Sequence, residues 1–536
     1  MIPHLRRAKQ LLLVSMTCVA ALGSAGCDTE LTVECRSVLE ALTQLQKLHL
    51  AAATQRGALD PAQFQYAQIS LLAQRHVKIP EKTPHKPLEQ CEGTLELLRQ
   101  AYPQTPIREF TLDLLTNTTR QWDPHSVALS EQALSSQSGF LRGFGFSVER
   151  SDDTGRVEVV DVIAGSPAHI ASLQEGMFIW TVNRKYVREI STTDLVAAIN
   201  DRNSESLSLG VLGGPSGVGG VPLGYREIRV SRGTFEASPV KFAQFRALDA
   251  RGAARSIGYL KIRNFSGAQA IFAEDLRGLR GSDALVLDLR NISGGEIEAA
   301  RDIADLLLAD SESFVGLMSR SGLVSDVVPM KSLSIAWDNP LVVLVNATTK
   351  SAAEILAGTL QDHGAIVVGT RTFGKGTRQT LVPLAKFNLT GGVFLTDAYT
   401  VRPSGKLIQF QGITPDIALQ LGSQPKLEEN YPHALKAPAD VAPLPGYDPT
   451  GLPTRSRAFR ARLAQIESEI RAFVERRSSA ASQEDLQLEA AKQAALFLIG
   501  QADRAGVGGA QDIQRPVSSL TSSEETPSLL LPVSSF

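Results

Sequence analysis

The chain has 536 residues, too many for one hydrophobic core, and typical domain sizes predict roughly three or four domains. Its 54 basic and 56 acidic residues nearly balance, so no overall field attracts nucleic acid or an anionic surface. The composition is that of an ordinary globular protein and gives no support to a nucleic-acid partner.

Residues 1–26 read as a secretory signal. Basic residues precede an apolar stretch from Leu11 to Leu22, which is too short to span a bilayer as a mature helix. Small residues followed by Cys27 resemble a bacterial lipoprotein signal, in which this cysteine is lipidated and becomes the mature N-terminus. Because Ser24 replaces the usual leucine, an ordinary cleaved signal is the alternative. We expect the protein on the periplasmic side of the bacterial cell envelope, held to a membrane by its lipid.

Residues 27–137 predict a helical domain, in which Leu-rich helical patterns are interrupted by proline-bearing loops. Of the four cysteines, Cys18 lies in the signal and Cys27 would carry the lipid, which leaves Cys35 and Cys91 in two Leu-rich segments. In an oxidising compartment a disulfide that joins two helices is expected. Two cysteines without nearby histidines do not make a zinc site.

Between residues 138 and 232 the pattern changes to short alternating strands separated by turn residues, which predicts a compact β-rich domain. The glycine-rich stretch at 213–220 is followed by neither Lys-Ser nor Lys-Thr, so it reads as a flexible hairpin connection rather than a phosphate site.

A short GFGF stretch in this domain has glycines that allow consecutive backbone N–H groups to face a terminal carboxylate. It consists of Gly143, Phe144, Gly145 and Phe146. The plainer alternative is a tight turn between strands. The later stretch AGSPAHIASLQEGMFIWTVN is similar to a segment of PDZ domains, which bind the C-terminus of a peptide as an added strand. Met177 stands where these domains usually have aspartate, a departure that affects a turn more than the groove.

Residues 233–425 alternate strands and helices, and the continuously apolar strands predict a buried, largely parallel sheet covered by helices. Residues 426–505 are predicted as a helical segment, and 506–536, rich in serine, as a disordered tail. The helical ends could support a homo-oligomer or hold an activating adaptor, although amphipathic helices more often pack on their own domain.

Three segments place unusual residues where apolar strands of the α/β region end. They are DLRNISGG at 288–295, NATTKSAAE at 346–354 and GTRTFGKGTRQT at 369–380. Ligands and catalytic groups gather at such strand ends because helix amides converge there. The third segment has the glycine and lysine spacing of a P-loop, but Gly376 follows Lys375 where magnesium binding needs Ser or Thr. The residues that follow read as a strand, which disfavours a phosphate site.

Ser351 begins a predicted helix, and the sequence Ser-Ala-Ala-Glu from Ser351 to Glu354 has the form of a capping box. Taken alone, the segment therefore favours a structural role for this serine. A Ser-His-Asp triad with His363 is disfavoured, because twelve residues of helix separate the two side chains by about 18 Å. No nucleotide fingerprint or metal cluster appears elsewhere in the sequence, so we expect no cofactor and no metal.

Taken together, the three segments resemble the carboxy-terminal processing, or tail-specific, proteases, which are serine peptidases with an embedded PDZ domain. The family patterns DLRNNPGG, NGGSASASE and GEKTFGKGSVQT match them in order. Further matches are DPHS at 123–126, RPSGK at 402–406, GITPDI at 412–417 and DLQLEAA at 485–491. The resemblance implies a multidomain α/β protein, with a crotonase/ClpP-like serine protease core, an inserted PDZ domain and helical terminal segments.

The resemblance also implies roles for individual residues. It makes Ser351 the nucleophile, Lys375 the general base and Gln379 the residue that orients the base. Backbone N–H groups of Gly295 and Ala352 would form the oxyanion hole. An ordinary lysine with a pKa near 10.4 cannot accept a proton at neutral pH, so burial must lower its pKa. The implied partners are protein substrates captured by their C-terminal tails.

Some positions depart from the family pattern. Lys350 replaces a small residue beside the nucleophile; it could help to lower the pKa of Lys375 or extend its charge into water, and the second is favoured because lysine is long. Ile292 and Ser293 replace Asn-Pro beside the oxyanion glycines. These departures leave open a second hypothesis, a catalytically inactive scaffold that only binds peptides through its PDZ domain.

Overall fold

The computed structural model describes most of the chain between residues 29 and 505. The described ranges are 29–50, 60–81, 84–135, 140–150, 155–163, 165–191, 194–195, 198–199, 201, 204–212, 224–236, 238–308, 313–331, 337–419, 426–450, 452, 456–478 and 485–505. The predicted signal with Cys27, the glycine-rich stretch at 213–220 and the predicted tail at 506–536 lie outside them. Within these ranges, no helix has the length and apolar character needed to cross a membrane.

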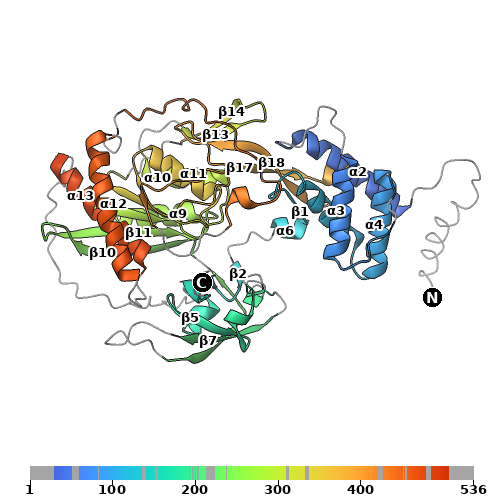
Figure 1. Ribbon diagram of the computed structural model, residues 1–536, viewed down its shortest axis with the longest axis horizontal. Helices are drawn as coiled ribbons and strands as arrows, with labels where there is room; N and C mark the ends of the chain where they lie inside the picture. Colours follow the sequence, from blue (N-terminus) through green and yellow to red (C-terminus); the bar gives the residue numbers. More distant parts are fainter. Residues whose placement is uncertain are drawn as a thin grey trace, which may run out of the picture.

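The N-terminal helices lie at one end of the molecule (Figure 1). They are α2 (Glu30–Leu48), α3 (Pro61–Gln74), α4 (Pro87–Ala101) and α5 (Ile107–Thr119). Asp60 caps α3 by accepting a hydrogen bond from the N–H of Ala62, and Pro61 begins that helix. Cys35 on α2 and Cys91 on α4 form a disulfide, which confirms the pairing expected from the sequence.

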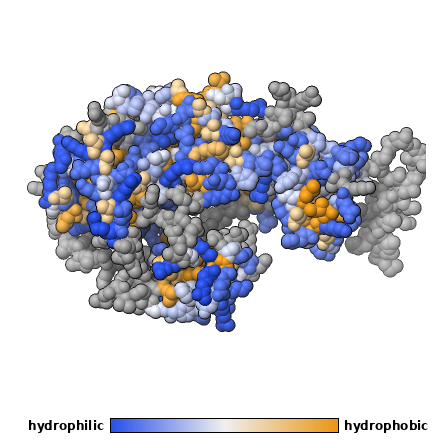
Figure 2. Space-filling model, viewed as in Figure 1, coloured by the Kyte–Doolittle hydropathy of each residue, from blue (hydrophilic) through white to orange (hydrophobic). Residues whose placement is uncertain are grey.

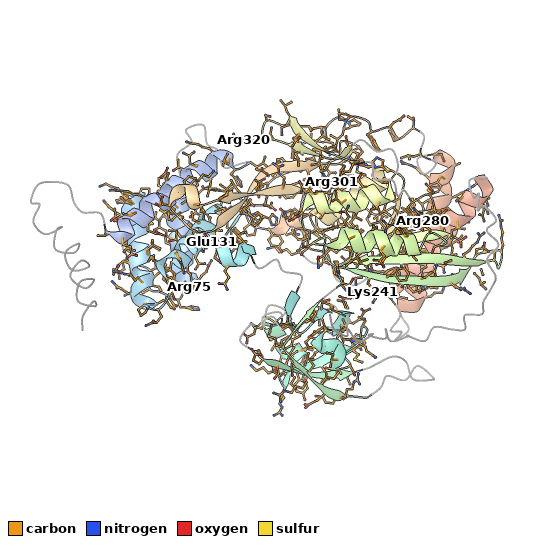
Figure 3. The ribbon with its side chains drawn as sticks, turned by 180° about the vertical axis from the view of Figure 1, so that it is seen from behind. Arg75, Glu131, Lys241, Arg280, Arg301 and Arg320 are labelled. Carbon is orange, nitrogen blue, oxygen red and sulfur yellow. A yellow bond between two sulfur atoms is a disulfide. The ribbon has the colours of Figure 1, made fainter. Side chains whose placement is uncertain are left out.

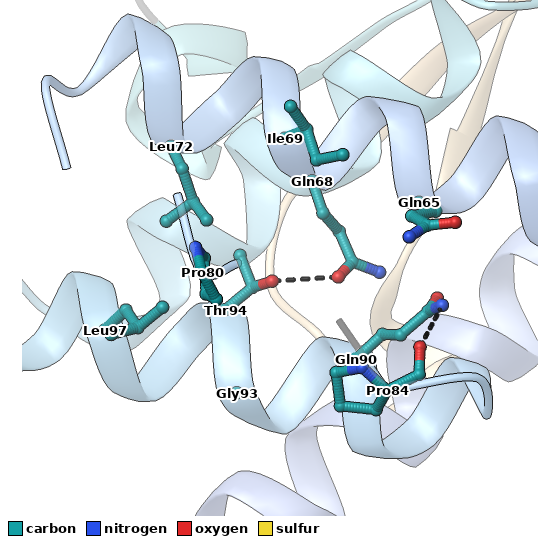
Figure 4. Close-up of a pocket in the computed structure, with 10 residues that line it drawn as sticks. All are labelled: Gln65, Gln68, Ile69, Leu72, Pro80, Pro84, Gln90, Gly93, Thr94 and Leu97. Carbon is teal, nitrogen blue, oxygen red and sulfur yellow. Dashed lines mark hydrogen bonds between the residues drawn. The ribbon is translucent and has the colours of Figure 1, made fainter. Parts of the chain in front are cut away.

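A hollow of about 60 Å³ lies between α3 and α4 (Figure 4). Its apolar walls include Leu72 and Leu97, and Figure 2 shows apolar side chains gathered over the same helical domain. Gln68 accepts a hydrogen bond from Thr94 at 2.8 Å on its floor. The hollow belongs to the helical domain and includes none of the residues of the three strand-end segments.

The predicted PDZ module lies below the rest of the molecule in Figure 1. Its sheet has the order β3-β4-β5-β7-β8, with β6 paired to β5. The strands are β3 (Phe146–Arg150), β4 (Val157–Val162), β5 (Phe178–Val182), β6 (Lys185–Tyr186), β7 (Ser206–Leu212) and β8 (Arg226–Ser231). Met177, the departure from the PDZ pattern, is fully buried among these strands.

The module is joined to the core by a pair of strands and by ion pairs. Strand β2 (Phe140–Gly143) pairs with β9 (Gly233–Glu236). Arg263 contacts Asp161 at 3.2 Å, and Lys241 contacts Glu175 at 2.9 Å. Figure 3 shows Lys241 on the side of the core that faces the module.

The α/β core contains the predicted parallel sheet in the order β10-β11-β12-β15-β16-β19. Its strands are β10 (Val240–Leu248), β11 (Ala254–Ile262), β12 (Ala284–Asp288), β15 (Leu341–Val345), β16 (Ile366–Gly369) and β19 (Ile417–Ala418). The pairs from β11 to β19 are parallel, whereas β10 is an antiparallel edge strand. The prediction of a buried, largely parallel sheet is confirmed.

Helices cover both faces of this sheet. One face packs on α9 (Ala268–Gly278), α10 (Ile297–Leu307) and α11 (Ala352–Asp362). The other face packs on α12 (Arg457–Ser478) and α13 (Leu486–Ala505). Residues 426–450 contain one short 3-10 helix and several turns but no α-helix, so the predicted helical segment at 426–505 is corrected: its helices begin at Arg457. The proline-rich run between 437 and 449 explains the absence of an α-helix there.

A second, antiparallel sheet was not predicted as a separate unit. It has the order β1-β18-β13-β14, with β17 paired to β18. The strands are β1 (Val127–Leu129), β13 (Ser313–Met318), β14 (Val324–Pro329), β17 (Thr377–Pro383) and β18 (Gly392–Val401). Apolar residues of β17 and β18 share one hydrophobic core with the N-terminal helices. This shared core fixes the helical domain against the strand that carries Gln379.

Candidate active site

Ser351 lies at the sharp turn between strand β15 and helix α11. Its backbone has φ 56° and ψ −122°, a conformation that is unfavourable for a residue with a side chain. The surroundings hold it there: its N–H donates to Glu354 Oε2 at 2.9 Å, and the N–H of Lys350 donates to the carbonyl of Ile292 at 2.9 Å. Strain of this kind collects at functional sites, where the neighbouring structure can hold it.

The glycine-rich loop after β12 lies directly against this serine. A Cβ on Gly294 would come within 2.9 Å of the Cβ of Ser351, and its φ of 110° also favours glycine. Gly295 packs on the ring of Phe265. Ala352 is the first residue of α11, where backbone N–H groups have no acceptor within the helix. Of the predicted oxyanion donors, Ala352 thus follows Ser351 directly and Gly295 follows the glycine that packs on it, and their role stays a prediction.

Lys375 follows β16 and reaches back to the serine. Its Nζ lies 3.4 Å from Ser351 Oγ, 2.6 Å from Gln379 Oε1 and 3.2 Å from the carbonyl oxygen of Thr377. The predicted strand after Gly376 is confirmed as β17, and it places Gln379 beside the lysine. The structure therefore brings Ser351, Lys375 and Gln379 together, with no helix start beside Lys375 of the kind that a P-loop needs.

Burial changes the acid–base behaviour of this lysine. The side chain of Lys375 is only 8% exposed, and desolvation lowers its pKa to about 8, although nearby carboxylates oppose the shift. A lysine with this pKa is partly neutral close to neutral pH, so it can accept a proton from a serine hydroxyl.

Glu354 connects the backbones of the two central residues. Its fully buried carboxyl group accepts hydrogen bonds from the N–H groups of Ser351 and Lys375, both at 2.9 Å. It also accepts from the N–H of Gly374 at 2.7 Å and from the hydroxyl of Thr372. Burial raises the pKa of Glu354 to about 7, although these hydrogen bonds lower it. The glutamate predicted as part of a capping box thus also holds the lysine segment against the start of α11.

Lys350 lies over an aromatic ring, with its Nζ 4.1 Å from the centroid of the Phe373 ring. The side chain is half-buried, and desolvation lowers its pKa. Its positive charge in turn contributes to lowering the pKa of Lys375. Of the two predicted possibilities, an influence on the pKa of Lys375 therefore agrees better with the structure than full extension into water. Of the other two departures, Ile292 is buried in the core of the sheet and Ser293 is exposed.

No sequence pattern indicates that Glu428 lies near the site. This carboxylate is buried and lies 2.8 Å from His125 Nε2, and its charge is the largest of those that oppose the lowered pKa of Lys375. The DPHS segment was matched without a role for its histidine, and 303 residues separate the two partners. Only the tertiary structure brings them together.

The GFGF stretch lies in the PDZ module, apart from this cluster. Gly145 has φ 81°, and a Cβ there would collide with the side chain of Ser166. Its carbonyl accepts hydrogen bonds from the N–H of Ile163 and the hydroxyl of Ser166. Phe144 is buried, with the guanidinium of Arg232 over its ring. These contacts fix the loop between β2 and β3, and its role in peptide binding stays a prediction.

Comparison with known proteins gives two family matches. Residues 256–419 match the model of peptidase family S41, and residues 135–212 match that of the PDZ domain. Ser351, Lys375 and Gln379 lie inside the first match, and the GFGF stretch lies inside the second.

Individual relatives agree with these matches. The chain is 34% identical over 331 residues to a carboxyl-terminal-processing protease of Synechocystis sp., covering 60% of this chain and 74% of that protein. It is 33% identical over 288 residues to carboxyl-terminal-processing peptidase 3, chloroplastic, of Arabidopsis thaliana, covering 53% of this chain and 54% of that protein. A solved structure of a photosystem II D1 C-terminal processing protease is 26% identical, with a TM-score of 0.40 and coverage of 66% of this chain and 92% of that one.

Proposed function

This chain is a protease of the carboxyl-terminal-processing family, and we propose that it hydrolyses peptide bonds with Ser351 as nucleophile and Lys375 as general base. The observation that carries the proposal is the contact of 3.4 Å between Lys375 Nζ and Ser351 Oγ, made by a lysine whose pKa is lowered to about 8. A scaffold that had lost catalysis would be under no requirement to keep this contact, so the geometry favours the enzyme.

Hydrogen bonding aims the base at the nucleophile. A neutral lysine has two N–H hydrogens and one lone pair. The carbonyl of Thr377 and Oε1 of Gln379 can each accept one of the hydrogens, at 3.2 and 2.6 Å. The lone pair is then left to face the hydroxyl of Ser351. This arrangement suits proton abstraction and disfavours a lysine that merely donates to the serine.

The proposed reaction follows from these positions. Ser351 Oγ attacks the peptide carbonyl while Lys375 takes its proton, and the N–H groups of Gly295 and Ala352 stabilise the oxyanion, typically by about 3 to 4 kcal/mol for each donor. When the C–N bond breaks, Lys375 returns the proton to the leaving amine. The same lysine then deprotonates a water molecule that attacks the acyl-enzyme ester, and it returns this proton to Ser351 Oγ when the ester C–O bond breaks.

We propose that the PDZ domain selects substrates by their C-terminal tails. The support is the PDZ match over residues 135–212 and the fixed loop at Gly145, which such domains use to hold a terminal carboxylate. Tail capture raises the local concentration of the remaining chain at the core, because the second binding event becomes intramolecular.

The test compares the mature enzyme with Ser351→Ala on an unfolded protein that ends in an apolar tail. The same substrate with a charged tail serves as the matched control. We expect cleavage by the native enzyme alone, faster with the apolar tail. Equal cleavage by the native enzyme and Ser351→Ala would refute the role of Ser351, whereas equal rates on both tails would refute tail capture.

We further propose that the enzyme is exported and lipid-anchored through Cys27. The basic and apolar residues of segment 1–26 support export, and so does the Cys35–Cys91 disulfide, because such bonds persist in oxidising compartments. Cys27→Ala should move the protein from the membrane fraction to the soluble fraction. An unchanged membrane fraction would exclude this anchor.

A further inference from the structure

We propose that Asp123 and Thr396 are positioning residues of the reaction: together they fix which way the side-chain amide of Gln379 points, and so aim Lys375 at Ser351. The proposal rests on the proposed Ser-Lys function and adds residues to it from outside the three strand-end segments. It also assigns a role to the N-terminal helical domain, which supplies Asp123.

A continuous hydrogen-bond chain runs from the base to this domain. Gln379 Nε2 lies 3.1 Å from Thr396 Oγ1, and Thr396 Oγ1 lies 3.0 Å from Asp123 Oδ1. Thr396 is completely buried on β18, and Asp123 is 1% exposed. Asp123 Oδ2 in turn lies 2.7 Å from Nε2 of His49, the residue that ends helix α2. The chain therefore crosses the shared core between β18 and the N-terminal helices.

The chemistry of the groups sets the direction of every bond in this chain. An ionised carboxylate can only accept, so the Thr396 hydroxyl must give its single proton to Asp123. The oxygen of Thr396 can then only accept, and the partner that Gln379 presents to it must be its NH₂ group. The carbonyl oxygen of Gln379 consequently faces Lys375, as the proposed mechanism requires. With the amide reversed, an NH₂ group would compete for the lone pair of the lysine.

The carboxylate end of the chain is held ionised. Burial alone would raise the pKa of Asp123, but hydrogen bonds from His49 and Ser126 outweigh it and bring the pKa to about 2. The N–H groups of His125 and Ser126 also donate to Asp123 Oδ1, at 2.7 and 3.0 Å. Asp123 is thus an acceptor over the whole range of pH in which the protein would work.

The backbone of Thr396 is fixed by the same domain. Its N–H donates to Ser126 Oγ at 3.1 Å, and its carbonyl accepts from the N–H of Leu50 at 2.9 Å. Gln379 Nε2 also lies 3.3 Å from Thr377 Oγ1, a longer contact within its own strand. That hydroxyl can donate as well as accept, so it does not by itself fix the amide. Asp123 is therefore the group that decides which end of the Gln379 amide faces Thr396.

The test measures the second-order rate at which a fluorophosphonate labels Ser351 in the mature full-length enzyme, a readout independent of tail binding. Thr396→Val removes the hydroxyl but keeps the shape, and should slow labelling roughly 10- to 100-fold, the scale of loss when a catalytic group is misplaced. Thr396→Ser keeps the hydroxyl and should label within about threefold of the native rate, because the hydrogen bonds that orient Gln379 can still form. Asp123→Asn should slow labelling as much as Thr396→Val does. The side-chain amide of asparagine can donate a hydrogen bond to Thr396, which would reverse the direction of the hydrogen bonds between Asp123 and Gln379.

A double-mutant comparison separates positioning from general destabilisation. If Thr396 acts through Gln379, adding Thr396→Val to Gln379→Ala should cause no further loss. A loss of the same factor in both backgrounds, or native labelling rates in Thr396→Val and Asp123→Asn, would overturn the inference. If Thr396→Val does not fold, Asp123→Asn with and without Gln379→Ala decides by the same rule. Failure of the native enzyme to label at Ser351 would instead overturn the proposed function.

Discussion

At the scale of single residues, the environment of Lys375 determines its chemistry. Burial lowers its pKa from an ordinary 10.5 to about 8, so the proton leaves as the pH rises through about 8 and the lysine becomes a base above it. The positive charge of Lys350 adds to this effect. We therefore expect Lys350, which departs from the family pattern, to favour the neutral form of Lys375.

The pH profile tests this effect. The acidic limb of kcat/KM should have its midpoint near pH 8 in the native enzyme. Lys350→Ser removes a like charge, so the pKa of Lys375 should rise and the limb should move to higher pH. Lys386→Ser, at an exposed lysine also placed over a phenylalanine ring, serves as the control and should leave the profile unchanged. A limb that stays in place in Lys350→Ser would contradict the account.

Glu354 offers a second residue-scale prediction. Glu354→Gln keeps the shape but turns an NH₂ group toward backbone N–H groups, so we expect a loss of about 1 to 3 kcal/mol in the free energy of unfolding and a strong loss of activity. Glu298→Gln, an exposed glutamate in the first turn of α10, is the matched control. Denaturant titration and peptide cleavage are the measurements. Equal stability of Glu354→Gln and the native protein would show that the carboxylate does not hold the site together.

The sequence could predict the residues whose chemistry is local. Ser351, Lys375 and Gln379 each belong to a short stretch with a recognisable pattern. Thr396 belongs to no such stretch, and the DPHS match that begins at Asp123 indicates no role for it, because its contact with Thr396 joins residues 273 positions apart. The position of Lys350 could not be predicted from the sequence, because it depends on Phe373, whose ring is placed next to it only by the fold.

At the scale of elements, hydrophobic period predicted most strands and helices of the parallel core. The antiparallel sheet could not be predicted, because its strands β1, β13, β17 and β18 come from distant parts of the chain. The spacing of apolar residues within a segment indicates a strand but not the strand with which it pairs. The disulfide between α2 and α4 could be predicted by counting cysteines, since few pairings were available.

The disulfide should contribute strongly to the stability of the helical domain. It joins residues separated by 56 positions, and the chain-entropy model assigns about 4 kcal/mol to closing a loop of that length. Replacing both cysteines, by Cys35→Ser with Cys91→Ser, should lower the free energy of unfolding by about that amount. Reductant should destabilise the native protein equally and leave the double variant unaffected. A native protein insensitive to reductant would contradict this prediction.

At the scale of the whole molecule, the PDZ module is held to the core by partly buried ion pairs as well as by chain connections. Asp161 of the module is 15% exposed and contacts Arg263, which is 12% exposed. Pairs of this kind are screened less by salt than exposed ones. The placement of the PDZ module therefore depends on a few charged side chains.

Removing one of these charges should loosen the module. Arg263→Ala should raise the radius of gyration in small-angle X-ray scattering, because the module then samples more orientations. Arg280→Ala, at an exposed position of the core labelled in Figure 3, should leave the scattering unchanged. Identical scattering of both variants and the native protein would show that the ion pair does not fix the module.

The central claim is that Lys375, neutral when it acts, activates Ser351. Peptide mapping of the fluorophosphonate adduct at pH 9 tests it most directly, in the native enzyme and in Lys375→Met, which keeps an unbranched side chain without the amine. We expect an adduct on Ser351 in the native enzyme and almost none in Lys375→Met, with both proteins folded. An adduct on another residue, or equal labelling of Ser351 in both proteins, would contradict it.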